Sequence, residues 1–212
     1  MAPTTFTDMG MLFDLNGFDV DMVPYGQPVS PADIEAELVI VLPVVDYASP
    51  DGDADLYDEA WSQPEIAALE SYVAQGGLLV LTNSAYRLRG GNWRMKDTNE
   101  DWPDANALAQ LFGVSYQAET LAPGSIAQIQ SDHPVVEGEE RLMLVEGNSV
   151  PFTLDVKGEV LATLQDEPVA ALVDYGDAGG QVLILADVGI FGSGREEPAN
   201  VALWKKLIEY AR

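Results

Sequence analysis

The chain contains no cysteine and only one histidine, His133, among its 212 residues. Without cysteine it cannot form a disulfide, a thiolate zinc site, an iron–sulfur cluster or a cysteine nucleophile. A single histidine likewise excludes a multi-histidine metal centre. We therefore expect no cofactor, with calcium held by oxygen ligands as the one exception that the composition leaves open.

Basic residues are scarce as well. Ten Lys and Arg stand against 35 Asp and Glu, which gives a formal net charge of -25. This charge repels a phosphate backbone or an anionic membrane, so we expect no nucleic-acid partner. No apolar run approaches the length of a membrane span and the start of the chain does not resemble a signal peptide, so no membrane insertion is expected. The acidity fits ordinary solubility, an extracellular setting or high salt, and the compartment stays open.

The hydrophobic residues, 47% of the chain, suffice for one domain that spans residues 1–212. Leu38–Leu42 and Leu78–Leu81 are continuous apolar runs, typical of strands buried on both faces of a parallel sheet. Between them Ser62 and Glu65 form a capping box, which predicts a helix that a Gly-Gly pair ends. The sequence therefore predicts a strand, helix and strand with a right-handed crossover.

The remaining chain extends this α/β pattern. A helix is predicted at the start of the chain, then a strand over 18–23, and a C-terminal helix is predicted after Pro198. Short strands follow Val114, and we expect these to be antiparallel additions in the C-terminal half. The last buried strand is expected at 182–185. The predicted core comprises Val39, Val41, Leu79, Leu81, Leu183 and Leu185.

Polar residues follow three of the predicted parallel strands. In such sheets, ligands bind beyond the carboxyl ends of the strands, where these residues should converge. The candidate ligand-binding residues from this argument are Asp46, Tyr47, Asn83, Ser84, Tyr86 and Asp187.

The segment after the second of these strands concentrates positive charge. Arg87, Arg89 and Arg94, three of the ten basic residues, fall within eight positions, together with Trp93. Arginine offers bidentate contacts and tryptophan a stacking face, which suits a sugar or a carboxylated ligand. We expect this loop over the crevice, with Arg87 or Arg94 facing Asp46, Asp187 or a bound anion. The alternative is that nearby carboxylates pair with these arginines internally.

Two weaker catalytic candidates are Ser84 and His133. Ser84 follows a strand as a nucleophile elbow does, but lacks the flanking glycines that such a turn needs. His133 precedes Pro134, and the alternative to a role as general base is a turn residue that bonds locally. A carboxylate-based activity around Asp46 and Asp187 is a further alternative.

Asp51, Asp53 and Asp55 alternate as the first ligands of a calcium loop do. Leu56 stands where such a loop needs glycine, and Ser62 stands where it needs a bidentate glutamate. A solvated acidic loop is the simpler interpretation of this segment.

The order of these pieces resembles the class I glutamine amidotransferase-like superfamily, in particular its DUF4350-type and ThuA-like branches. The resemblance rests on "LVIVLP", "YVAQGG", "LLVLTNS", the loop Asp-His-Pro-Val-Val-Glu-Gly and "GGQVLILADVGIFG". It implies a flavodoxin-like parallel sheet between helices, and the ThuA-like branch weakly implies carbohydrate binding or processing.

The chain departs from this family at its catalytic positions. Amidotransferases carry a cysteine at the elbow, where this chain has Thr82-Asn83-Ser84, and a His-x-Glu pair after the last strand, where it has Asp187-Val188-Gly189. Glutamine hydrolysis is therefore not expected. A first strand is also missing, so segments 18–23 and 38–42 should pair directly, or a partner strand should lie between them.

Three functions remain in competition. The first is a non-catalytic amidotransferase-like domain that binds a small ligand or a protein at the carboxyl edge of its sheet. The second is a hydrolase using Ser84 with His133 or using carboxylates, and the third is a structural module of a larger surface protein.

Overall fold

The structure is a computed structural model, in which residues 7–21, 23, 28–36, 38–42, 61–83, 86–89, 92–95, 102–117, 121, 124, 126–145, 149–191 and 200–212 are described. Its α-helices are α1 (Thr7–Leu15), α2 (Gln63–Ala74), α3 (Trp102–Ala109) and α4 (Val201–Tyr210). Short 3-10 turns are η2 (Pro31–Ile34), η4 (Gln110–Phe112) and η5 (Val188–Phe191). The strands are β1 (Leu38–Val41), β2 (Leu78–Thr82), β3 (Tyr86–Arg89), β4 (Asn92–Met95), β5 (Val114–Tyr116), β6 (Ile126–Ile129), β7 (Arg141–Met143), β8 (Phe152–Leu154), β9 (Gly158–Leu164), β10 (Glu167–Tyr175) and β11 (Gly180–Leu185).

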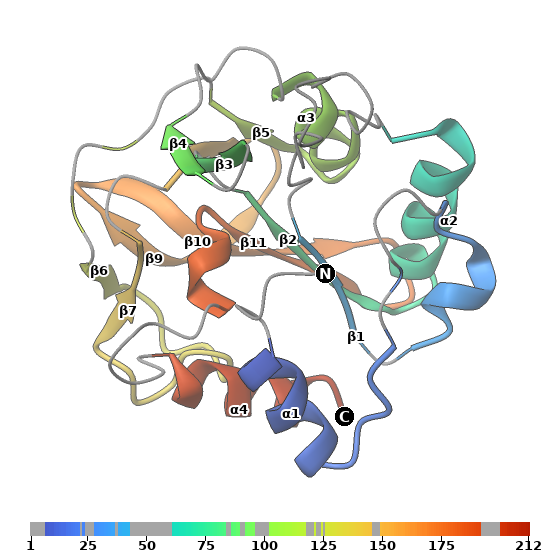
Figure 1. Cartoon of the computed structure of the whole chain (residues 1–212), viewed down its shortest axis with the longest axis horizontal. Coiled ribbons are helices and arrows are strands. Elements are labelled where there is room, and N and C mark those ends of the chain that lie inside the picture. Colours follow the sequence, from blue (N-terminus) through green and yellow to red (C-terminus); the bar gives the residue numbers. More distant parts are fainter. Residues whose placement is uncertain are drawn as a thin grey trace.

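A seven-stranded mixed sheet forms the centre of the molecule, in the order β1-β2-β11-β10-β9-β6-β7 (Figure 1). Only the β1–β2 and β2–β11 pairs are parallel, and the remaining neighbours are antiparallel. The α/β class and the antiparallel additions are thus as predicted. A flavodoxin-like parallel sheet is not confirmed, since most of the pairing is antiparallel.

The predicted strand, helix and strand are present as β1, α2 and β2. The capping box starts α2, with the Ser62 backbone N–H donating to Oε2 of Glu65 at 2.9 Å. The buried face of α2 includes Leu69 and Val73, and α2 lies beside β2 and β11. Gly180 makes this close approach possible, because a Cβ at that position would lie 1.7 Å from the carbonyl oxygen of Val73.

Tight turns dictate the antiparallel half of the sheet. Gln165 and Asp166, both with positive φ, are the two residues between β9 and β10. Paired positive φ values are those of the hairpin turn whose twist matches the flanking strands. Four residues, with Gly176 and Gly179 at positive φ, connect β10 to β11. Connections this short cannot return a chain to parallel pairing.

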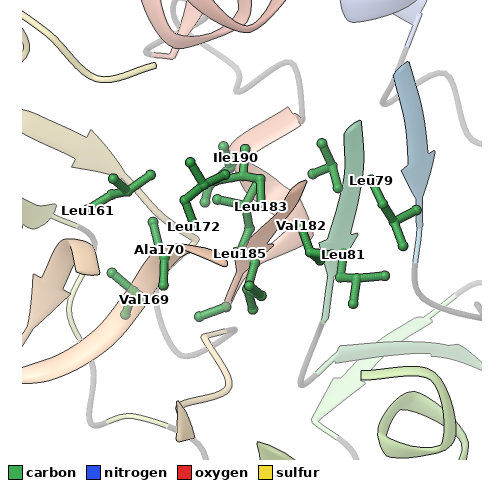
Figure 2. Packing of buried hydrophobic residues seen from close by; sticks show 14 of the residues in the cluster. Leu79, Leu81, Leu161, Val169, Ala170, Leu172, Val182, Leu183, Leu185 and Ile190 are labelled. Carbon is green, nitrogen blue, oxygen red and sulfur yellow. The ribbon is translucent and has the colours of Figure 1, made fainter. Parts of the chain in front are cut away.

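Helices cover both faces of the sheet. Figure 1 draws α2 and α3 on one side and α1 and α4 on the other. The core between them is apolar, and Figure 2 shows Leu79, Leu81, Leu183 and Leu185 packed along β2 and β11. All four are buried, as predicted. Val39 and Val41 were expected to be equally buried, but they are only half-buried, because β1 lies at the edge of the sheet, where they still pack against the core.

The strand predicted over 18–23 is wrong for the described residues 18–21 and 23, which form no strand. Phe18 instead packs edge to face on Phe13, with ring centroids 5.6 Å apart, and the guanidinium of Arg212 lies 5.2 Å from the Phe18 ring centroid. The expected direct pairing of this segment with β1 is therefore not made. Within the part of the chain that is described, no helix is long and apolar enough to cross a membrane.

Candidate functional site

The carboxyl ends of β2 and β11 meet, as the sequence predicted. The Val188 backbone N–H donates to the carbonyl oxygen of Asn83 at 2.8 Å, so the two segments that leave these strands touch. Thr82 fastens the neighbouring strand, because its hydroxyl donates to the carbonyl oxygen of Val41 at 2.8 Å. Three adjacent strands therefore end in one polar layer.

Asp187, a predicted ligand residue, is fully buried in this layer. One carboxylate oxygen accepts a hydrogen bond from the Val145 N–H at 2.5 Å and the other accepts one from the Gly189 N–H at 2.8 Å. These charge-assisted bonds fasten the chain around residue 145 and the start of η5 to the end of β11. Gly189 is required at this distance, because a Cβ there would lie 2.2 Å from a Val145 methyl group and 2.9 Å from Oδ1 of Asp187.

The same edge holds a residue that sequence reasoning missed. Ser149 is 2% exposed, and its hydroxyl makes no hydrogen bond within the described structure. The next residue, Val150, donates its N–H to the Ala186 carbonyl oxygen at 2.8 Å, so the chain at Ser149 is attached to the end of β11. A lone serine before an apolar strand carries no sequence pattern that would have identified it.

Tyr116 closes the edge from the side of β5. Its hydroxyl donates to the Leu185 carbonyl oxygen at 3.4 Å, and burial raises the pKa of this phenol well above its usual range. Tyr116 is therefore neutral at physiological pH. With Asn83, Ser149 and Asp187 also buried, the described part of this edge is a packed polar layer and does not form an open crevice.

The β3–β4 hairpin begins three residues after Asn83, and Figure 1 draws it at the end of β2. A loop is expected here from the sequence, but Gly90-Gly91 between two short runs is also a hairpin signal. The register places Arg87 opposite Arg94. It also places Leu88 opposite Trp93 and Arg89 opposite Asn92.

Residues directly opposite one another, and residues two apart in a strand, belong to the same face of a hairpin. One face therefore comprises positions 87, 89, 92 and 94, with three arginines and an asparagine. The other face comprises Tyr86, Leu88, Trp93 and Met95. The hairpin thus separates positive residues from aromatic and aliphatic ones, a segregation invisible until the register is known.

His133 is placed away from this edge. Its Nδ1 accepts a hydrogen bond from the Val135 N–H at 3.3 Å, and its ring packs on Tyr210 with centroids 5.1 Å apart. Tyr210 in turn donates to the side chain of Gln181, which is level with Leu78 at the amino ends of β11 and β2. His133 is therefore a turn residue that bonds locally, which was the alternative to a role as general base.

Several predicted site residues lie outside the described residues: Asp46, Tyr47 and Ser84, and the acidic candidates Asp51, Asp53 and Asp55. Tyr86, Arg87, Trp93 and Arg94 are placed by the backbone register of the hairpin alone. The residues that the structure does describe include no cluster of three or more side chains suited to a metal ion.

Comparison with known proteins yields similarities of fold. No family model and no curated protein matches the chain. The structure is similar to the cytoplasmic protein STM3548 from Salmonella typhimurium, with a TM-score of 0.63 and 14% identity over 97% of this chain and 86% of that one. It is also similar to the mmIFT52 N-terminal domain, with a TM-score of 0.67 and 12% identity over 98% and 90% of the two chains.

A third similar structure is larger. The β-galactosidase from Rahnella sp. R3 matches with a TM-score of 0.53 and 14% identity over 91% of this chain, which corresponds to 25% of the enzyme. At such identities these likenesses concern the fold alone. They carry no activity over to this chain.

Proposed function

We propose that this protein is a non-catalytic binding domain of the amidotransferase-like superfamily, and that it binds a small anionic ligand, an acidic carbohydrate in the first instance. The binding surface is the arginine-bearing face of the β3–β4 hairpin, positions 87, 89, 92 and 94. The observation that carries the proposal is the register in which Arg87 stands opposite Arg94.

Like charges directly opposite each other in a hairpin are destabilising. A chain with 35 acidic residues could have placed a carboxylate at either position, yet three of its ten basic residues share this face. A carboxylate of a ligand, held by the planar guanidinium groups, relieves the repulsion and gains bidentate hydrogen bonds. The opposite face provides Trp93 and Tyr86, residue types that pack on apolar protein surface, which leaves the arginine face for the ligand.

The absence of catalysis in this proposal rests on the residues of the sheet edge. The chain has no cysteine, and its one histidine is bonded within its own turn near the amino ends of the parallel strands. Asp187 is fully buried and its carboxylate holds two backbone N–H groups. These described groups therefore do not pair a nucleophile with a general base at the carboxyl edge.

Sugars are the first ligands to test, because the ThuA-like resemblance implies carbohydrate and a β-galactosidase contains a similar fold. Calorimetric titration with trigalacturonate should show binding, while the neutral sugar maltotriose should not bind. The double variant R87Q/R94Q should bind the acidic sugar at least about tenfold more weakly, since two bidentate pairs are lost. R87K/R94K keeps the charge, and its affinity for the acidic sugar should lie between those of R87Q/R94Q and the parent protein.

The matched control is K205Q/K206Q, which removes two positive charges from α4. It should change the affinity less than about twofold, because these lysines lie outside the hairpin. Absence of binding by the parent protein, or equal losses in the two double variants, would contradict the proposed function.

A further inference from the structure

The two edges of the central sheet differ in how they are protected. At one edge, the side-chain amide of Asn200 occupies the position of a neighbouring strand: its Oδ1 accepts from the Met143 N–H at 2.9 Å and its Nδ2 donates to the Met143 carbonyl at 2.9 Å. The outward N–H and C=O groups of Met143 in β7 are thereby satisfied. Exposed edges that lack such protection are sites at which further strands pair.

The opposite edge is β1. Its four residues pair with β2, and no other described segment forms a strand against it. The sequence of β1, Leu-Val-Ile-Val, contains none of the lysine, proline or inward charge that usually guards an edge. All four side chains are half-buried, so each keeps apolar surface in contact with water.

A strand docked against β1 would be stabilised by backbone hydrogen bonds and by the burial of apolar surface. Alternate residues of an edge strand direct N–H and C=O groups outward, and an added strand pairs them. Its side chains would also cover apolar surface of Leu38–Val41. The nearby segment 18–23, which has the alternation of a strand, does not fill this role in the described structure and leaves Val20 46% exposed.

We propose that the outer edge of β1 accepts an extended segment of another protein, which adds to the sheet as a further strand. The segment carries alternating β-branched residues with lysine or arginine at its ends. This proposal is independent of the ligand proposed for the β3–β4 hairpin.

The acidic charge of the protein favours a basic partner segment over a second copy of the chain. Each copy carries a formal net charge of -25, so pairing two β1 edges brings two strongly acidic surfaces together. Asp33 and Glu35, just before β1, are exposed and would lie beside one end of an incoming strand. Basic ends on the incoming strand convert this repulsion into attraction.

The test uses the intact protein and three synthetic peptides. The first is Lys-Lys-Val-Thr-Val-Ile-Val-Lys-Lys, the second replaces its central valine with proline, and the third replaces its lysines with glutamates. Fluorescence anisotropy measures binding, and hydrogen exchange followed by mass spectrometry locates it. We expect the first peptide to bind at least about tenfold more tightly than either of the others, because it alone offers both the strand and the charge.

Hydrogen exchange of the amides in β1 should slow in the presence of the first peptide, while exchange in β7 should not change, since Asn200 already closes that edge. Glu35→Lys should weaken binding by about threefold or more, because Glu35 precedes β1 by three residues. Glu209→Lys makes the same change of charge on α4, which does not pair with β1, and should have a smaller effect. Both glutamates are exposed.

Three results would overturn the proposal. The first is equal binding of the proline peptide, which would show that charge alone attracts it. The second is protection elsewhere than in β1, and the third is a dimer in light scattering of the protein alone with β1 already protected, which would identify a second copy as the occupant.

Discussion

Asn200 pairs with Met143 through both of its side-chain polar atoms, while its Nδ2 also donates to the Ile190 carbonyl oxygen at 3.1 Å. One carboxamide thus joins the edge of the sheet, η5 and the start of α4. The Ile190 carbonyl receives a second bond, from Nε1 of Trp204 at 2.9 Å. This role could not be predicted from the sequence, because a single asparagine before a helix is typical of an N-cap.

Asn200→Ala should lower the free energy of unfolding by about 2–4 kcal/mol, because it leaves the Met143 N–H and C=O without partners at a buried site. Urea denaturation of the variant measures this. Asn16→Ala is the matched control, since Asn16 is exposed and its amide bonds only to Leu12 one turn earlier. It should cost less than about 0.5 kcal/mol. Equal losses in the two variants would contradict a structural role for Asn200.

Leu79→Ala should cost about 2–5 kcal/mol, because Leu79 is fully buried at the centre of the parallel strands and truncation leaves a cavity. The control is Leu15→Ala, at a side chain that is 78% exposed. It should change stability by no more than about 0.5 kcal/mol. A loss below about 1 kcal/mol at Leu79, measured by reversible denaturation, would place this strand outside the core.

Gly180→Ala should destabilise the protein by at least about 3 kcal/mol, because the new Cβ would lie 1.7 Å from a backbone oxygen of α2 and neither backbone can yield cheaply. Gly10→Ala, inside α1, meets nothing within 4 Å. It should be neutral or stabilising by up to about 1 kcal/mol, since alanine favours a helix over glycine. Melting temperatures of the two variants should therefore move in opposite directions, and a similar fall in both would be inconsistent with the packing described.

Glu65 makes stability depend on pH. Burial raises the pKa of its carboxyl, but hydrogen bonds from Ser62 and from the Val29 N–H, the latter at 2.9 Å, outweigh burial and hold the pKa below its usual value. A lowered pKa in the folded state contributes stability above the unfolded pKa, and this is lost as pH falls through the folded value. Glu65→Gln should therefore cost about 1 kcal/mol at pH 7 and progressively less below pH 4.5.

Chemical denaturation at several pH values between 3 and 7 checks this difference. Glu35→Gln provides the control, because Glu35 is exposed. Its effect on the free energy of unfolding should be small, because its side chain is surrounded by solvent. A cost of Glu65→Gln that does not change with pH would exclude the ionised carboxylate as its origin.

Local chemistry made much of the fold predictable. The capping box of Ser62 and Glu65 and the apolar runs of β1, β2 and β11 each act over a few residues, and each element lies where it was expected. Gly113, which ends η4, has φ of +70°. Strand partners lie far apart in the sequence and follow from no local pattern. The predicted extent of parallel pairing was therefore too large, and the side chains of β1 are less buried than predicted.

The candidate site was less predictable for the same reason. That Asn83 and Asp187 lie at one edge follows from strand direction alone, and the structure brings them together. That Asp187 is buried depends on Val145, which is 42 positions away along the chain and whose approach no local pattern specifies. The shared face of Arg87 and Arg94 depends on a register that the turn between β3 and β4 determines.

The arrangement around β2 also determines an order of folding. β2 lies between residues 38–41 and residues 180–185, so its second neighbour comes from about a hundred positions later in the chain. The β9, β10 and β11 strands are joined by turns of two and four residues and incur little loop-closure entropy. We expect them to form first and to serve as the template on which β2, and then β1, assemble. Pulsed hydrogen exchange during refolding should accordingly protect the amides of β10 before those of β1, and the N-terminal half should stay open until the end of the chain has been synthesised.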